Sequence, residues 1–515
     1  LLPGAAWVAM GLGGPAGGVL SLVRALGFGV AWTAALILGT RAASQRFTVL
    51  LDLSPALTLA LWLAAAWRMR GRSATAGEAD AYAPGSFARL AGPALFAVLA
   101  AAALASLHAG RTGTPVSYFS DSPDHIATVR RMLQTGDAFP NDAFFADAGP
   151  AGADPRKGLW HPQVALIAAL AQVDPAAAWR QLPAAIAPLF ILNLAQLGWQ
   201  SGRGGLGGYP AGAALFAWVQ LLVLAGSLQW FPLRKAVFST FLADQLCFAT
   251  AVALLADLAR PSRAARLAVV GLALGAVACH VYSSIQLALT LGALVAGLAL
   301  RERSLRGPAA RALGTAALVG LASLPYLLWR AHQSYAPVNI IHTAPQGLLW
   351  ITRSLRVISV GVLWDWMGWL WLLFPLAWWP LWRHGRQNPA ALYALTTSLA
   401  VALVIFNPFA VSVLEPRLGY LLMRMIWMVP VGALIGWMLL ALGGAVGNRT
   451  GAARGRALAA LVTLLLILLP TARDAMATFL APRFFAQADL DQSPLRWSEA
   501  MAWMERSLPP GQVVL

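Results

Sequence analysis

The stretch that decides the fold joins an apolar run, LAGPALFAVLAAAALASLHAG (90–110), to a polar one, YFSDSPDHIATVRRM (118–132). The first run contains no Asp, Glu, Lys or Arg, and its length meets the ~20 residues that an apolar helix needs to cross a bilayer. The second run gathers titratable side chains, namely Asp121, Asp124, His125, Arg130 and Arg131. The sequence therefore places a dense polar cluster directly after a predicted membrane span.

The rest of the chain has the same apolar character. Of its 515 residues, 59% are hydrophobic and 11% are charged, whereas soluble domains carry about 25% charged residues. Long apolar runs rich in Leu, Ala and Trp predict helical spans, because helices satisfy their own backbone hydrogen bonds in lipid. We predict an all-α polytopic membrane protein with about 11–14 transmembrane helices and a long outer loop. The predicted spans are 2–20, 22–40, 48–67, 89–108, 181–199, 207–227, 237–259, 264–281, 283–300, 311–329, 356–380, 390–409, 419–443 and 457–471.

Basic residues between the spans predict the orientation. Counting spans places five basic loops on one side, and they are 68–72, 260–266, 301–311, 383–386 and 449–456. Lys and Arg accumulate in cytoplasmic loops, so the net charge of +17 is interpreted as a topology signal, and no nucleic-acid partner is expected. The long loop 110–180 then lies outside the cytoplasm. We expect the inner membrane of a bacterium or archaeon, with an extracytoplasmic site.

Three regions are predicted along the chain. Residues 1–87 form extra N-terminal transmembrane helices, and residues 88–471 form a transmembrane core with the loop 110–180 as its catalytic loop. Residues 472–515 are expected to open an outer soluble segment that is truncated here, because a helix at about 493–507 leads through Pro-Pro-Gly into a candidate strand.

The outer loop carries two short predicted helices. HPQVALIAALAQV (161–173) is too short to span and is expected to lie in the membrane interface. IATVRRML (126–133) is amphipathic, and Ser122-Pro123 marks its start. Asp121, Asp124 and His125 then gather at one helix end, where a carboxylate can act as a general base or hold a divalent cation. The alternative is that both carboxylates only cap the helix and favour its dipole, which stabilises it by about 1 kcal/mol.

The segment SDSPDHIATVRRMLQTGDAFPNDAFFADAGPAG...GLWHP (120–162) resembles the first outer loop of the GT-C superfamily of membrane glycosyltransferases. It is most similar to the loop in catalytic subunits of oligosaccharyltransferases and related polytopic transferases. The matching positions, in order, are Asp121, His125, Gly136, Phe139-Pro140, Asp142 and Trp160-His161-Pro162. The Trp-Trp-Asp type acceptor motif of oligosaccharyltransferases is absent from the sequence, so the acceptor stays open among glycan, lipid and protein.

The resemblance implies specific roles. Asp121 would be the catalytic carboxylate, with Asp124 as the alternative. His125, Asp142 and His161 would contact substrate, and Asp121 with Asp142 would hold Mg²⁺ or Mn²⁺ if the enzyme uses a metal.

GT-C enzymes use a sugar attached to a polyprenyl phosphate, and a phosphate needs cationic partners near the outer face. Arg424 lies inside a predicted span, where an Arg usually faces a cavity or a partner, and Arg417 lies at the outer boundary of that span. Arg234 and Lys235 supply a second cationic position. The alternatives are snorkelling of Arg424 and anchoring of Arg234 and Lys235 to lipid headgroups.

Three acidic residues lie in the outer parts of predicted spans: Asp244, Asp365 and Glu415. Each would line the outer cavity or pair with a nearby Arg, as Glu415 would with Arg417.

The preferred hypothesis is an inverting hexosyl- or pentosyltransferase of the GT-C type. It takes sugar from a polyprenyl-phosphate donor, and an Asp serves as general base. A multi-span transporter or lipid flippase is the alternative, with Asp244, Asp365 and Arg424 along a substrate pathway. A noncatalytic assembly subunit is a third reading. The Gly-rich runs 11–18 and 202–208 do not follow strands, so a nucleotide site is not expected.

Overall fold

The computed structural model describes most of the helical body. The described residues are 2–10, 19–72, 122–140, 158–179, 181–183, 185–186, 189, 193, 197, 237–332, 347–367, 373–480 and 507. The first half of this part contains the elements α1 (Leu2–Ala9), α2 (Val19–Ala42), η1 (Phe47–Val49), α3 (Leu50–Arg72), α5 (Ser122–Thr135), α6 (Trp160–Leu170), α10 (Ser239–Ala259), α11 (Arg263–Cys279), α12 (Ser283–Glu302) and α13 (Pro308–Ala331). The second half contains β1 (Leu348–Trp350), β2 (Arg356–Ile358), α14 (Val360–Met367), α15 (Leu373–Gly385), α16 (Pro389–Ile405), α17 (Pro408–Leu418), η6 (Gly419–Met428), α18 (Val431–Asn448) and α19 (Gly451–Leu480).

The described helices confirm a polytopic membrane protein. Seven of them are long and apolar enough to cross a membrane, or up to eight if the bent pair α16–α17 counts as one span. The predicted spans 89–108 and 207–227 lie outside the described residues, and 181–199 is described only in part. The predicted count of spans is therefore tested only over the described ranges.

Two predicted spans take a different form. Where the span 356–380 was expected to begin, β1 and β2 form an antiparallel hairpin with Leu349 opposite Val357, and α14 and α15 follow as two short helices. The β-branched pair Val357-Ile358 favours a strand. The sheet is a small local exception in a helical fold.

The predicted span 419–443 is confirmed as one candidate span, Leu421–Asn448, but the helix type changes along its length. It begins as the ten-residue 3₁₀ helix η6 and continues as α18 after Pro430. Runs of 3₁₀ helix longer than 3–4 residues are uncommon and often mark a functional hinge. Gly419 begins η6 at φ +54°, and Pro430 lacks the N–H that a continuous helix would use.

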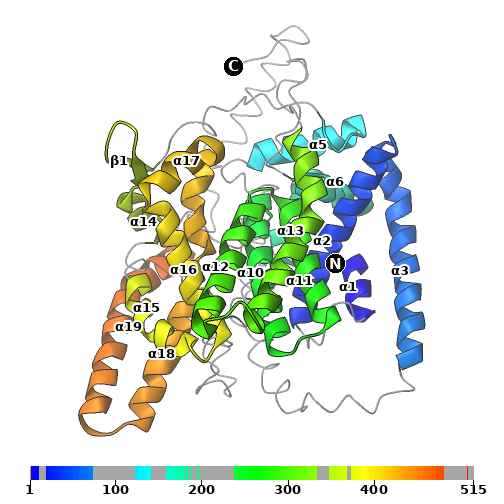
Figure 1. Ribbon diagram of the computed structural model, residues 1–515. Coiled ribbons are helices and arrows are strands. Elements are labelled where there is room, and N and C mark those ends of the chain that lie inside the picture. The colour runs from blue at the N-terminus through cyan, green and yellow to red at the C-terminus, as the bar shows by residue number, and fades with distance from the viewer. Residues whose placement is uncertain are drawn as a thin grey trace.

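The outer-loop helices gather at one end of the bundle (Figure 1). The N–H of Leu159, just before α6, donates to the oxygen of Ala278 at the end of α11 at 2.6 Å. The N–H of Phe47, in the turn between α2 and α3, donates to the oxygen of Gly136 after α5 at 2.9 Å. The basic residues 68–72 end α3, and the basic run 449–456 connects α18 to α19 and forms the first turns of α19, both at the opposite end in Figure 1.

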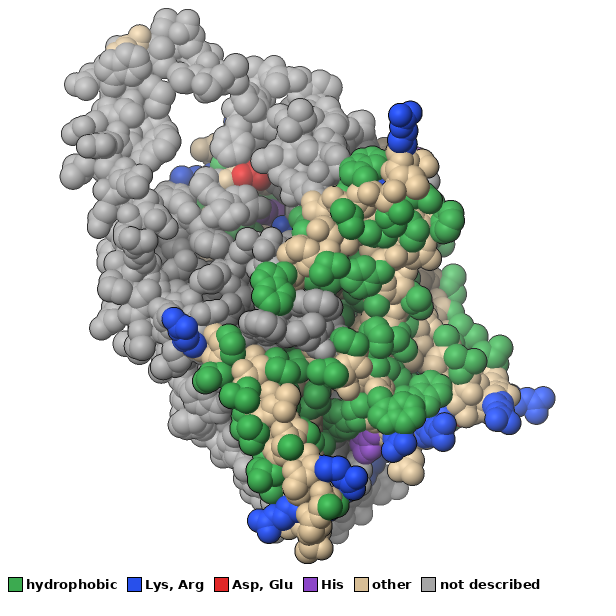
Figure 2. Space-filling model, turned by 90° about the vertical axis from the view of Figure 1, so that its left-hand side faces the viewer, with side chains coloured by type: hydrophobic (Ala, Val, Ile, Leu, Met, Phe, Trp, Pro, Cys, Tyr) green, Lys and Arg blue, Asp and Glu red, His purple; other side chains and the backbone are tan. Residues whose placement is uncertain are grey.

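The helices α14, α15 and α19 present apolar side chains outward, and Figure 2 shows hydrophobic atoms across the described part of this face, with several Lys and Arg side chains toward its lower edge. Trp379 and Trp382 on α15 are exposed, and Arg383 lies over the Trp379 ring at 4.5 Å. Aromatic rings beside cationic groups are typical of a membrane interface.

Helix α10 lies at the centre of the core. It packs against α11, α12, α13 and α2, and 94% of its apolar window is buried. This burial makes α10 the rigid element around which the outer site is arranged.

Candidate functional site

The first turn of α5 is fixed by a buried aromatic ring. Trp179 is buried, and its Nε1 donates to Ser122 Oγ at 3.3 Å. The His125 ring stacks on Trp179 with centroids 5.1 Å apart. Ser122 is the residue after Asp121, and Asp124 lies in the same turn, half-buried. The predicted helix start is confirmed, although the Ser122 hydroxyl serves as the acceptor for Trp179.

Two histidines meet beneath this turn. His125 Nδ1 lies 2.5 Å from His161 Nε2, and the rings stack with centroids 4.8 Å apart. Their side chains are 5% and 1% exposed, so the pair faces inward. In such a contact one ring nitrogen donates and the other accepts. The pair therefore joins α5 to α6 through a buried side-chain contact.

The residues at the start of α10 contact both the His125 ring and α6. The Phe238 ring meets the His125 ring edge-on at 5.1 Å, and Trp160 Nε1 donates to the oxygen of Val237 at 2.5 Å. The outer-loop helices are thus attached to the residues that begin α10.

Arg424 reaches the same helix start from the other half of the bundle. Its Nη1 donates to Thr240 Oγ1 at 3.4 Å, and its guanidinium lies 5.1 Å from the Trp427 ring centroid. Thr240 is two residues after Phe238. The guanidinium and the His125 cluster therefore both contact the first turn of α10, although 299 residues separate Arg424 from His125 in the sequence (424 − 125).

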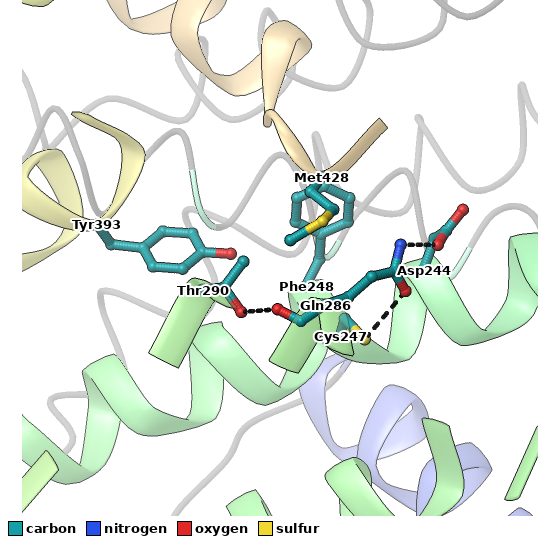
Figure 3. Close-up of a pocket in the computed structure, with 7 residues that line it drawn as sticks. All are labelled: Asp244, Cys247, Phe248, Gln286, Thr290, Tyr393 and Met428. Atoms are coloured by element: carbon teal, nitrogen blue, oxygen red, sulfur yellow. Dashed lines mark hydrogen bonds between the residues drawn. The ribbon is translucent and has the colours of Figure 1, made fainter. Parts of the chain in front are cut away.

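A polar network surrounds Asp244, which lies one turn after Thr240 along α10 (Figure 3). Asp244 is buried and accepts a hydrogen bond from Gln286 Nε2 at 2.5 Å. Cys247 Sγ contacts Gln286 Oε1 at 3.8 Å, so both ends of the Gln286 amide are engaged. A cavity of about 10 Å³ adjoins the network, with room for about one water molecule. It is lined by Asp244, Cys247, Phe248, Gln286, Thr290, Tyr393 and Met428.

The segment after α5 packs through the Phe139 ring, which lies between two Arg side chains. The guanidinium carbons of Arg41 and Arg330 each lie 5.7 Å from the Phe139 ring centroid. The Trp329 ring meets Phe139 at 5.3 Å. Arg41 also lies 3.7 Å from the Asp137 carboxylate. These contacts dock the end of the loop helix on α2 and α13.

One exposed ion pair joins α5 to the segment after α6. Arg130 donates to Asp174 at 2.9 Å. Burial acts to raise the pKa of Asp174, but hydrogen bonds from the Ala176 N–H and from Arg130, together with the Arg130 charge, outweigh it and lower that pKa. The carboxylate is therefore ionised at neutral pH.

The predicted site residues divide into two sets. Asp124, His125, His161 and Arg424 are described, and the structure joins the last three through the start of α10. The others lie outside the described residues, and they are Asp121, Asp142, Arg234, Lys235 and the side chain of Arg417. Their roles stay predictions.

One ion pair was not foreseen from the sequence. Glu415 binds Arg356 at 2.8 Å, and its pairing with Arg417 stays a prediction, because the Arg417 side chain lies outside the described residues. The bend of 78° between α16 and α17 and the hairpin packed on α17 bring β2 to this carboxylate. The side chain of Asp365 lies outside the described residues.

A metal site is not visible in the described ranges, since no group of three or more His, Cys, Asp or Glu side chains converges there. The two predicted metal ligands, Asp121 and Asp142, both lie outside those ranges.

Several contributors were missed from the sequence: Trp179, Phe238, Thr240 and Gln286. Each is an ordinary residue of an apolar helix or its edge, and only tertiary packing gives it a polar partner or a ring to stack on. The sequence offered one signal for two of them: a Gln or Thr inside an apolar run needs a polar partner, and it therefore indicates a face that is buried against protein.

Comparison with known proteins identifies the fold. No protein-family model and no curated protein matches the chain. The structure of the Archaeoglobus fulgidus oligosaccharyltransferase in its apo form is similar, with a TM-score of 0.50 and 12% sequence identity, over 82% of this chain and 60% of that chain. The structure of the same enzyme tethered by a disulfide to an acceptor peptide containing the NVT sequon has a TM-score of 0.51 and 12% identity, over 81% and 58%. The chain thus spans about 60% of the length of that enzyme. The chain thus shares the fold of this oligosaccharyltransferase, as the predicted resemblance implied.

Proposed function

We propose that the chain is a GT-C-type membrane glycosyltransferase that moves a sugar from a polyprenyl-phosphate donor to an acceptor at the outer membrane face. One observation carries the proposal. The first turn of α5, which contains Asp124 and directly follows Asp121, contacts the start of α10 through His125 and Phe238. The guanidinium of Arg424 contacts the first turn of α10 at Thr240. This arrangement supports the proposal, because a general base on that turn and a phosphate-binding Arg424 would lie at the same end of one rigid helix.

The proposed chemistry is a single displacement with inversion. An Asp carboxylate, Asp121 or Asp124, accepts the proton of the acceptor hydroxyl as that oxygen attacks the anomeric carbon. The bond from that carbon to the phosphate oxygen breaks, and Arg424 stabilises the charge that develops on the leaving phosphate. Trp179 and the His125–His161 pair hold the turn in place.

The fold supports this class of reaction, because the similar solved structure is an oligosaccharyltransferase. A divalent cation, Mg²⁺ or Mn²⁺, fits the proposal through Asp121 and Asp142. The acceptor class stays open among glycan, lipid and protein.

The test is sugar transfer by purified protein in proteoliposomes, with radiolabelled polyprenyl-phosphate sugars and a panel of acceptors. Replacing the general base, by Asp121→Asn or Asp124→Asn, is expected to lower kcat about 10²–10⁴-fold. Asp174→Asn is the matched control, since this carboxylate lies on the same loop in an exposed ion pair. Full activity in both folded variants would refute the assignment.

A transporter or lipid flippase is the second candidate, because Asp244 and Arg424 are charged groups on membrane-spanning segments, which often mark substrate pathways. Flux of a polyprenyl phosphate across sealed vesicles, without sugar transfer to any acceptor, would favour it.

A further inference from the structure

Asp244, a candidate partner for Arg424, lies on α10, whereas Arg424 lies in η6. Asp244 follows Thr240 by one turn of α10, so both residues lie on one face of that helix. Arg424 Nη1 donates a hydrogen bond to Thr240 Oγ1 at 3.4 Å, and Asp244 is the next residue along the same face of α10. Arg424 therefore meets a face of α10 that presents a hydroxyl and a carboxylate one turn apart.

The carboxylate is itself held rigidly. Gln286 on α12 donates to Asp244 at 2.5 Å, and the contact of Cys247 with the amide oxygen of Gln286 fixes which end of the amide faces Asp244. In Figure 3 the Asp244 and Gln286 side chains point toward one another across the gap between α10 and α12. Asp244 thus has a defined position before any substrate binds.

Arg424 starts from a less rigid element. It lies in η6, and 3₁₀ hydrogen bonds have poorer geometry than α-helical ones. Met428, at the end of η6, lines the small cavity beside Asp244, so packing against this end of η6 is incomplete. A long side chain on such a segment needs an external partner to keep one orientation.

A charge inside the membrane also needs compensation. An unpaired Arg in the hydrocarbon region is costly and moves its guanidinium toward the headgroups. A fixed carboxylate at the depth of α10's second turn opposes that movement.

We infer that Asp244 and Gln286 are positioning residues for Arg424: Asp244 holds the guanidinium at the first turns of α10, and Gln286 holds Asp244, so that Arg424 meets the donor phosphate at one place. The inference rests on the proposed function of Arg424 and adds to it the two side chains that orient the phosphate site. Neither side chain touches the substrate.

Asp257 supplies a matched control. It is a second buried Asp on the same helix, near the opposite end, where it accepts from the Ser262 N–H at 3.2 Å. Replacing it removes a buried carboxylate from α10 without altering the surroundings of Arg424.

The experiment measures the Kd of the purified full chain for farnesyl phosphate in detergent, with farnesol as the probe that lacks phosphate. Asp244→Asn is expected to raise the Kd for farnesyl phosphate about 10–100-fold, a loss of the size that follows when a metal ligand loses its supporting hydrogen bond. The Kd for farnesol stays unchanged. Asp257→Asn lowers thermal stability but leaves both Kd values within about twofold, because it perturbs no phosphate ligand.

A double variant tests whether Asp244 acts through Arg424. If it does, Asp244→Asn combined with Arg424→Gln binds farnesyl phosphate no more weakly than Arg424→Gln alone. Additive losses would overturn the inference, because Asp244 would then act by another route.

Gln286→Met keeps the carboxylate while removing its hydrogen bond, and a severalfold rise in Kd is expected. If Asp244→Asn does not fold, an unchanged Kd in Gln286→Met overturns the inference.

The two failures are distinguishable. Normal binding by Asp244→Asn with lost binding by Arg424→Gln overturns the positioning role and leaves the proposed function standing. Normal binding by Arg424→Gln defeats the phosphate role of Arg424, and the positioning role falls with it.

Discussion

Helix α10 and helix α19 contain candidate membrane spans of 21 and 20 residues, yet 94% of the apolar 18-residue window is buried in the first and only 11% in the second. The difference lies in their polar residues. Helix α10 carries Asp244, Gln245 and Thr250 inside its window, all buried. Within the apolar stretch of α19, the hydroxyl of Thr463 bonds to its own helix at Ala459. Overall apolarity identifies a span, whereas polar side chains that need partners identify which span faces the protein interior.

The largest effect should come from the cation that faces α10. Arg424→Gln is expected to lower the rate of sugar transfer about 10²–10³-fold, because it removes a group that stabilises the leaving phosphate. Arg454→Gln changes an exposed Arg at the start of α19 and should leave the rate unchanged. If Arg424→Gln and Arg454→Gln lowered the rate of sugar transfer equally, the functional distinction between α10 and α19 would be wrong. The measurement is kcat in proteoliposomes.

Substitution of one leucine by alanine in each helix compares the two helices by packing alone. Leu246 on α10 is 0% exposed and Leu466 on α19 is 61% exposed. Leu246→Ala should lower the free energy of unfolding by about 2–5 kcal/mol, because it leaves a cavity. Leu466→Ala should have little effect, because lipid fills the space. Thermal unfolding in detergent, followed by the loss of helical circular dichroism, gives both values. A Leu466→Ala variant as unstable as Leu246→Ala would show that α19 packs against protein.

Glycine substitutions sharpen the comparison at backbone contacts. A Cβ on Gly275 of α11 would lie 2.7 Å from the Gly27 oxygen of α2, whereas one on Gly443 of α18 meets nothing within 4 Å. Gly275→Ala should destabilise by about 1–3 kcal/mol through overpacking. Gly443→Ala should be neutral or stabilising, by up to about 1 kcal/mol, since Ala is the better helix former. Chemical denaturation of both variants decides; a stabilised Gly275→Ala would contradict the close approach of α2 and α11.

The smallest effect concerns an exposed charge, as a counterpart to the buried charges on α10. Asp174→Asn breaks the pair with Arg130, whose side chains are 48% and 53% exposed. We expect a loss below about 1 kcal/mol, because solvent screens such pairs. The pKa of Asp174 is lowered in the folded protein, so the pair stabilises at neutral pH. That contribution disappears as the pH falls below the ordinary value of 3.8, and the variant and wild type should then unfold alike. A difference that persists in acid would assign the effect to packing.

Sequence periodicity and length were sufficient for the membrane class and for the helix at 122–135, because an amphipathic pattern and a Ser-Pro start are local signals. They were insufficient for η6, where Gly419 and Pro430 interrupt an apolar run that looks continuous. The contact of His125 with His161 joins residues 36 positions apart, and that of Thr240 with Arg424 joins residues 184 apart. Such contacts depend on how helices pack, which a single sequence does not encode locally. The ion pair of Glu415 with Arg356 was not foreseen for the same reason: proximity in sequence suggested Arg417, whereas the packed hairpin brings Arg356 to this carboxylate.

The most direct test of the account is photocrosslinking with a polyprenyl phosphate that carries a diazirine next to the phosphate. The purified chain in nanodiscs would be labelled and the modified peptides mapped by mass spectrometry. The account predicts labels in 237–248, at the start of α10, and in 419–428 of η6, and their loss in Arg424→Gln. Labels confined to 457–470 of α19, with none on α10 or η6, would contradict it.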